Sequence, residues 1–160
     1  MANGAVITED AAEFRDALPE GGALIGLDLG SKTIGTAFCD ADWRFATSGK
    51  TIGKSKFSKD KAAIEALAAQ RSVKGLVIGL PLNMDGSAGP RVQSSRAFAR
   101  NLAVLGLPIL LWDERLSTVS AERDMIAQDF SRAKRAERID SHAAAVILQG
   151  AIDRLAGGIL

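Results

Sequence analysis

The sequence predicts one α/β domain built on a mixed five-stranded sheet, with helices on both faces. Three apolar runs, at 23–30, 75–81 and 108–114, are short and bounded by glycine or proline, as buried strands are. Helical patterns separate these runs, so strand and helix alternate along the chain. A length of 160 residues, with 47% hydrophobic and 24% charged residues, suits a single globular domain.

A short N-terminal segment precedes this domain. Thr8 can cap a helix over residues 8–17, and the acidic residues after it favour the positive end of that helix. Pro19 and a pair of glycines then break the chain. We therefore divide the chain into an N-terminal extension with a short helix, residues 1–22, and a domain, residues 23–156.

The domain begins with a meander of three antiparallel strands. The apolar run 23–30 leads into a turn, and residues 34–40 return as the second strand of a hairpin. A third strand is expected at 44–51, and the alanine-rich segment 59–70 follows it as a helix. These three strands form the antiparallel half of the predicted sheet.

Parallel strands and helices make up the rest of the domain. The strand 75–81 is apolar on both faces, which requires helices on both sides of the sheet. A glycine-rich loop leads to a helix over 91–105 that Gly106 closes, and the strand 108–114 follows. Two further helices are expected at 116–128 and 139–155, with a polar, basic stretch between them. Right-handed crossovers make this half of the sheet parallel.

The composition excludes several classes of site and location. One cysteine, Cys39, and one histidine, His142, cannot form an internal disulfide or a Cys/His zinc cage. A net charge of +1 is small for holding a long duplex, so nucleic-acid binding would need a local basic patch or bound cations. No signal peptide and no bilayer-length apolar stretch are visible, so we expect a cytoplasmic protein with no membrane partner.

Acidic residues lie in and at the end of two buried strands. Asp28 interrupts the first strand, where it either caps the following turn or meets a cation. Asp113 and Glu114 end another strand, at the edge where ligands bind in open α/β sheets. Alternation turns these two side chains to opposite faces, so only one of them can join Asp28. The residues alone do not decide between them.

Asp140 opens the last predicted helix. It can simply cap that helix, which competes with a functional role. It also shares a helical face with Ala143, Ala144 and Ile147, the stripe expected to pack on the sheet. Three carboxylates, two from strands and one from a covering helix, make an all-oxygen site suited to Mg²⁺ or Mn²⁺. A pair of such ions can hydrolyse a phosphodiester.

Four motifs extend over nearly the whole domain. They are GLDLGSKTIGTA at 26–37, VIGLPLNMDGS at 77–87, DERLSTVSAE at 113–122 and IDSHAAAVILQG at 139–150. In this order and spacing they resemble the YqgF/RuvX family of the ribonuclease H-like superfamily. Members of that family are described as Holliday-junction resolvases and as nucleases that mature the 5′ end of pre-16S ribosomal RNA. The resemblance implies a ribonuclease H-like fold for this chain.

The resemblance also implies roles for single residues. It identifies Asp28, Glu114 and Asp140 as the catalytic acids that hold metal, which favours Glu114 over Asp113. It places a further set of residues around the substrate cleft: Thr33, Asn83, Arg115, Ser117 and Thr118.

Two basic clusters are candidates for phosphate binding. The first is a group of five lysines: Lys50, Lys54, Lys56, Lys59 and Lys61. The second cluster ends with Arg138, two residues before Asp140, and is preferred for that reason. Its other three members are predicted to bind substrate: Arg132, Lys134 and Arg135. Charge runs are also typical of solvated loops, and the preferred cluster has the composition of a mobile segment. Aromatic residues make up 5%, so base stacking is expected to be limited.

The combined prediction is a two-metal-ion endonuclease, a hydrolase acting on phosphodiester bonds. Its expected substrate is structured rRNA precursor, in 5′-end maturation of pre-16S rRNA, with the ribosome as a candidate partner. The alternatives are a Holliday-junction resolvase on branched DNA and a non-catalytic RNA- or ribosome-binding protein of the same fold. A monomer or a homodimer is compatible with these readings, and symmetric junction cleavage would require the dimer. DLGSKTIG also resembles the phosphate loop of actin-like kinases, but those folds need two such domains, and 160 residues supply one.

Overall fold

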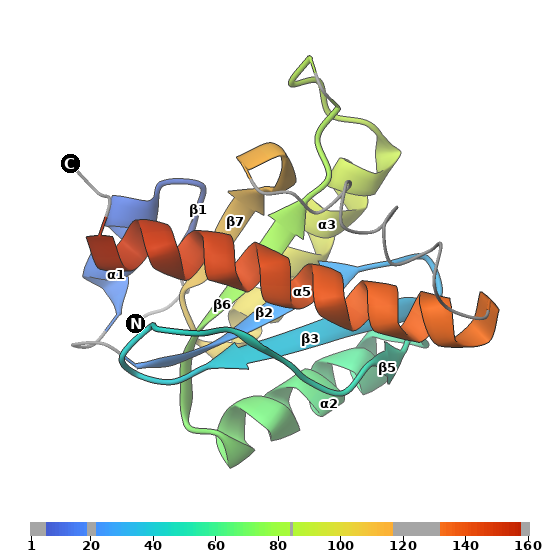
Figure 1. The fold of residues 1–160 in the computed structure, drawn as a ribbon, viewed down its shortest axis with the longest axis horizontal. Coiled ribbons are helices and arrows are strands. Elements are labelled where there is room, and N and C mark those ends of the chain that lie inside the picture. The colour runs from blue at the N-terminus through green and yellow to red at the C-terminus, as the bar shows by residue number, and fades with distance from the viewer. Residues whose placement is uncertain (1–5, 19–21, 84, 117–131, 158–160) are drawn as a thin grey trace.

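The computed structural model describes residues 6–18, 22–83, 85–116 and 132–157, and of residues 132–141 the backbone alone. These residues form a mixed sheet with helices on both faces (Figure 1), as the sequence predicts, but within the described residues the sheet has seven strands where five were predicted. In this part of the chain no helix is both long and apolar enough to cross a lipid bilayer.

The sheet combines an antiparallel hairpin with parallel strands. Its order in the described residues is β1-β7-β6-β2-β3-β4, with β5 paired to β3 as well. The hairpin consists of β2, Ala23–Leu29, and β3, Thr33–Cys39. β6, Val73–Leu80, lies between β2 and β7, Ile109–Asp113, and runs parallel to both. The carboxyl ends of β2, β6 and β7 therefore meet at one edge.

The outer edge beside β3 differs from the prediction. In place of one strand at 44–51, two short strands pair with β3: β4, Thr47–Ser48, and β5, Ile52–Gly53. Between them the Thr36 hydroxyl donates a hydrogen bond to the Lys50 carbonyl at 2.6 Å. The Gly49 backbone N–H still donates to the Thr36 carbonyl at 2.8 Å, so backbone pairing reaches Gly49, and the Lys50 carbonyl then takes a side-chain donor. A pattern of apolar residues does not reveal this change.

The N-terminal segment adds a strand and a helix to the same core. β1, Ile7–Thr8, pairs in parallel with β7, and α1 spans Ala11–Ala17. The prediction that Thr8 caps this helix is wrong, because Thr8 lies in the strand. Asp10 is the N-cap, and its carboxylate accepts a first-turn backbone N–H at 2.9 Å. Phe14 of α1 is fully buried.

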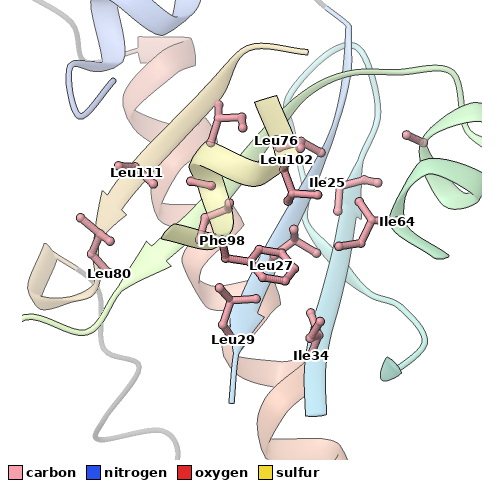
Figure 2. Packing of buried hydrophobic residues seen from close by; sticks show 14 of the residues in the cluster. Ile25, Leu27, Leu29, Ile34, Ile64, Leu76, Leu80, Phe98, Leu102 and Leu111 are labelled. Carbon is pink, nitrogen blue, oxygen red and sulfur yellow. The ribbon is translucent and has the colours of Figure 1, made fainter. Parts of the chain in front are cut away.

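Helices cover each face with a separate apolar cluster. α1 and α5, Arg132–Gly157, pack on one face, which we call the α5 face. α2, Phe57–Gln70, and α3, Pro90–Leu102, pack on the other. Figure 2 shows this second cluster, in which Leu27 of β2 lies beside Phe98 of α3. The burial of apolar side chains on both faces is the main stabilising contribution to such a layered fold.

One short 3₁₀ turn precedes β7 and another follows it. A 3₁₀ turn, Ala103–Leu105, follows α3, and Gly106 closes it with a φ of 78°, a left-handed conformation that glycine adopts without strain. A second 3₁₀ turn, Glu114–Leu116, follows β7. The helix predicted at 116–128 otherwise lies outside the described residues.

The last helix is longer than the sequence analysis predicts. α5 begins at Arg132, so residues 132–138 are helical and not a loop. Arginine, alanine, lysine and glutamate are good helix formers, which explains this result. Asp140 consequently lies inside the helix. The prediction that it opens the helix is wrong, and a capping role no longer competes for this residue.

Candidate catalytic site

Asp28 is a buried carboxylate one residue before the end of β2. It is 1% exposed. Two and four residues earlier, Gly26 and Leu24 lie on the α5 face: Leu24 belongs to the α5 cluster, and a Cβ on Gly26 would lie 2.8 Å from Leu148 Cβ. Because side chains alternate along a strand, Asp28 belongs to this face too.

Glu114 brings a second carboxylate to the α5 face. It follows β7 directly and opens the 3₁₀ turn there. Its Oε2 atom lies 2.8 Å from the position that a Cβ on Gly79 would take, and Ile147 of α5 lies 2.6 Å from the same position. Gly79 therefore lies beneath both α5 and the Glu114 carboxylate. A larger residue at this position would displace one of them.

Glycines flank Asp28 on both neighbouring strands. Gly35 of β3 pairs directly with Asp28. On the other side Leu27 pairs with Ile78, so the parallel register carries Asp28 next to Gly79. Neither neighbour has a side chain to fill the space beside the carboxylate. Asp28 lies between these two glycines, and the Glu114 carboxylate lies over Gly79 on the same face. The oxygen atoms of two such carboxylates suit a hard divalent cation.

Asp113 lies on the opposite side of β7 and binds Arg115. Its carboxylate accepts hydrogen bonds from the Arg115 Nε at 3.0 and 3.1 Å, from Nη2 at 2.6 Å and from the backbone N–H at 2.9 Å. These hydrogen bonds hold the pKa of Asp113 below its ordinary value and raise the pKa of Arg115. Of the two acids between which the residues alone did not decide, Glu114 is thus the one turned toward Asp28.

The loop after β6 lies against the same arginine. A Cβ on Gly86 would lie 3.3 Å from Arg115 Nη1. Asn83 holds this loop by donating to the Ser87 hydroxyl at 2.9 Å. The Asp85 carboxylate accepts the Ser87 backbone N–H at 2.8 Å, and hydrogen bonds from the side chain and backbone of Ser87 lower the pKa of Asp85. Asn83 and Arg115 therefore lie on neighbouring segments at the edge that carries Glu114.

The backbone gives the positions of two further predicted site residues, Thr33 and Asp140. Thr33 begins β3 and shares a face with Gly35, and hence with Asp28. Asp140 is four residues, about one helical turn, before Ala144, whose carbonyl lies 3.1 Å from the Cβ position of Gly26.

The remaining predictions fall on side chains outside the described part. Ser117 and Thr118 are not described, and only the backbone is described for Arg132, Lys134, Arg135 and Asp140. Among the described side chains, no three from His, Cys, Asp and Glu form a group that could hold a metal. Trp112 of β7 is 7% exposed and packs against Gly150, so it belongs to the core.

The sequence analysis missed the two glycines and the role of Asp113. Gly35 and Gly79 both lie in the motifs quoted above, and each stands inside a largely buried strand. A glycine inside a strand often marks a close approach of another group, which is the signal that could have found them. The spacing of Asp113 and Arg115, two residues apart at a strand end, could have suggested their ion pair.

Comparison with known proteins identifies relatives over most of the chain. Residues 22–154 match the family model described as RuvX, Holliday junction resolvase. A protein of Novosphingobium aromaticivorans is 72% identical over 152 residues, which cover 95% of this chain and 98% of that one. A protein of Sphingopyxis alaskensis is 66% identical over 150 residues, with 94% and 99% covered. Both are provisionally named pre-16S rRNA nucleases.

Solved structures show the same fold at low sequence identity. RuvC of T. thermophilus in complex with a Holliday junction substrate superposes with a TM-score of 0.54 and 10% identity, over 85% of this chain and 97% of that one. A second structure of Thermus thermophilus RuvC gives a TM-score of 0.50 and 12% identity, with 81% and 93% covered. At these identities the likeness concerns the fold alone, and it confirms the predicted ribonuclease H-like architecture.

Proposed function

Because this chain belongs to the RuvX family of nucleases and resolvases, we propose that it is a divalent-metal endonuclease acting on the precursor of 16S rRNA. The observation that carries this proposal is the placement of two carboxylates on one face of the sheet, with Glu114 above Gly79 and Asp28 beside Gly79 on the neighbouring strand. Such an arrangement stabilises nothing in an ordinary α/β core, because like charges at one site repel.

Asp28, Glu114 and Asp140 would hold the metal, as Mg²⁺ or Mn²⁺. The support for Asp140 is its position on α5, one turn from Ala144 and inside the helix, where it is not needed as a cap. When bound, a pair of such ions supplies an activated water and stabilises the leaving oxygen of a phosphodiester. The protein contributes the positions of the carboxylates, with Asp28 between glycines on both neighbouring strands.

Arg115 would bind a phosphate of the substrate close to the carboxylates. Asp113 already occupies its Nε and Nη2 groups, which orients the guanidinium before substrate arrives. A fixed orientation lowers the entropy cost of binding an anion. A further group of residues is assigned to the substrate from the family resemblance: Thr33, Asn83, Ser117, Thr118, Arg132, Lys134 and Arg135.

RNA is preferred to branched DNA as the substrate. The relatives at 72% and 66% identity carry names that refer to pre-16S rRNA, whereas the likeness to RuvC with its junction rests on 10% identity. Resolution of four-way junctions is the second candidate, because the matching family model is described by that activity. A non-catalytic RNA-binding role is disfavoured, because clustered carboxylates would repel phosphates unless a cation intervenes.

A cleavage assay on both substrates tests the proposal. Wild-type protein with Mn²⁺ or Mg²⁺ is expected to cut a pre-16S rRNA fragment near the mature 5′ end and to leave a four-way DNA junction intact. Asp28→Asn should lower the rate by roughly 100-fold or more, because one metal-holding carboxylate is lost. Asp16→Asn, which changes an exposed acid on α1, is the matched control and should cut like wild type.

The outcomes distinguish between the two candidate substrates and test the catalytic role of the carboxylates. Cleavage of the junction alone would replace the rRNA assignment by the resolvase assignment. Full activity of Asp28→Asn would contradict the catalytic role of the carboxylates.

A further inference from the structure

A large open cavity lies at the end of the sheet opposite the carboxylates. Its volume is about 850 Å³, and it lies at the amino ends of β2 and β6 and the carboxyl end of β3. Ala23 lines it, five residues before Asp28 on the same strand, which corresponds to about 17 Å at 3.3 Å per residue. The cavity is thus distinct from the candidate catalytic site.

Flat side chains form part of this cavity. Phe38 is buried in its wall, and the guanidinium carbon of Arg71 lies 3.9 Å from the centre of the Phe38 ring. Phe45 also lines the cavity and is 76% exposed. An exposed aromatic ring beside an open cavity presents a flat apolar face on which another ring can stack. Phenylalanine and guanidinium planes are the surfaces on which nucleobases stack.

The charges around the cavity suit a nucleotide. Arg71 and Lys74 both line it and are exposed, and neither pairs with a carboxylate of the described residues. Cations of this kind bind the phosphates of single-stranded nucleic acid while its bases stack on nearby rings. Asp40 is the acidic residue of the lining, and its carboxylate can accept a hydrogen bond from a base amino group.

The edge of the sheet connects this cavity with the carboxylates. After Phe45 the chain turns back along β3, with which first β4 and then β5 pair (β3 and β5 are labelled in Figure 1). It ends beside the β2–β3 turn, where the Lys54 backbone N–H donates to the Lys32 carbonyl at 2.9 Å and Lys54 Nζ donates to the Gly30 carbonyl at 3.2 Å. Gly30 is two residues after Asp28. Lys50 lies between the two ends of this route and is exposed.

We propose that residues 45–54, together with Arg71 and Lys74, bind a single-stranded segment of nucleic acid. We call these residues the edge surface. A base stacks on Phe45 in the cavity, and the phosphates follow Lys50 and Lys54 toward Asp28. The direction toward Asp28 rests on the proposed nuclease function, whereas the binding itself requires no cleavage. The low aromatic content is compatible with this, since one exposed ring at the end of a basic edge is sufficient to hold one base.

Binding of a labelled single-stranded oligouridine tests the edge surface directly. Fluorescence anisotropy is measured with a chelator present, so that cleavage does not contribute. Phe45→Ala should raise the Kd roughly 5- to 150-fold, the range found when a stacking ring is removed. Phe45→Trp should retain or improve binding. Val104→Ala is the matched control, because Val104 is 72% exposed and lies outside the lining of the cavity, and it should bind like wild type.

The salt dependence tests the cations. Arg71→Gln should reduce the slope of log Kd against log salt concentration by about 0.7, the value for one phosphate contact on a single strand. Arg100→Gln on α3 changes an exposed arginine outside the edge surface and should leave the slope unchanged. Because Arg71 also stacks on Phe38, thermal unfolding of both variants establishes that each is folded at the assay temperature.

The outcomes distinguish the edge surface from the nuclease proposal. If the protein cuts rRNA precursor while Phe45→Ala and wild type bind oligouridine equally, the edge surface is wrong and the nuclease proposal stands. If Phe45→Ala weakens binding while no form of the protein cuts, the edge surface stands and the nuclease proposal fails. Crosslinking of an iodouridine oligonucleotide should label the peptide that contains Phe45. Labelling confined to other peptides would leave the cavity to a protein partner and would overturn the inference.

Discussion

At the scale of single residues, two glycines determine which side chains surround Asp28. Asp28 has a glycine beside it on β3 and another on β6, so two side chains that would normally fill a sheet face are missing. The Glu114 carboxylate occupies part of the space above Gly79. The sequence predicted both acids, and the family motif was needed to prefer Glu114 to Asp113. The structure adds the physical reason, which is that Asp113 turns away and binds Arg115.

A methyl group at Gly79 should disturb the site more than the fold. In Gly79→Ala the new Cβ would lie 2.8 Å from Glu114 Oε2 and 2.6 Å from Ile147, so the carboxylate must move. We expect a loss of roughly 10- to 100-fold in cleavage rate, because a displacement of this size would misplace the proposed metal ligand Glu114. The cost in stability should be about 1–3 kcal/mol, as for other overpacked positions.

Cleavage kinetics and urea unfolding of the same variant measure these two effects. Gly157→Ala is the control, since a Cβ there would meet no atom within 4 Å. Equal cleavage rates for Gly79→Ala and Gly157→Ala would show that the Glu114 carboxylate is not needed in its observed place.

The ion pair of Asp113 and Arg115 should make a pH-dependent contribution. The folded-state pKa of Asp113 is lowered, chiefly by its hydrogen bonds to Arg115, so the native state binds the proton less readily than the unfolded chain. The stabilisation is therefore complete above the unfolded pKa of about 3.9 and is lost as the pH falls through the lower folded value. Because the pair is exposed to solvent, which screens the two charges, its contribution should be small.

Unfolding free energies of wild type and Asp113→Asn test the direction of this pH dependence. The difference between them should be constant near neutral pH and should shrink below about pH 4. A difference that grows on acidification would contradict it. Asp42→Asn is a suitable control, since its ion pair with Arg44 is more exposed.

At the scale of elements, the long strands and helices were predictable and the edges were not. β2, β3, β6 and β7 follow from apolar runs, and α2 and α3 follow from their periodicity and their stop signals. β1 has two residues and forms because β7 offers a free edge, which no local pattern encodes. The start of α5 was misplaced, since a charged stretch of good helix formers was read as a solvated loop.

The helical form of the basic stretch carries a prediction. Because α5 begins at Arg132, the cations of this stretch are carried on one helix that continues through Asp140. Arg135→Gln should weaken binding of rRNA precursor and lower the magnitude of the salt slope by about 0.7 to 0.9, depending on whether that contact is single- or double-stranded. Arg154→Gln, near the other end of α5, should leave both unchanged.

Filter binding over a range of salt concentrations provides this measurement. Identical slopes for Arg135→Gln and Arg154→Gln would remove the basic start of α5 from the substrate-binding surface.

At the scale of the whole molecule, the two ends of the sheet have different chemistry. The carboxyl ends of β2, β6 and β7 bring together acids and Arg115, and the opposite end carries the cavity with Phe45 and Arg71. A ribonuclease H-like sheet with helices on both faces leaves its edges as the places where a polynucleotide can approach. The fold class and the position of Asp28 and Glu114 near the carboxyl ends of strands were predictable from the sequence. The cavity was not, because it forms from segments distant in the chain.

Binding of Mn²⁺ to four forms of the protein tests the central claim most directly. Isothermal titration is performed on wild type, Asp28→Asn, Glu114→Gln and Asp113→Asn. If Asp28 and Glu114 hold the metal, wild type and Asp113→Asn should bind Mn²⁺ with similar affinity. Asp28→Asn and Glu114→Gln should bind it at least about 10-fold more weakly, since each loses a charged oxygen ligand. Equal binding by all four forms would contradict the claim.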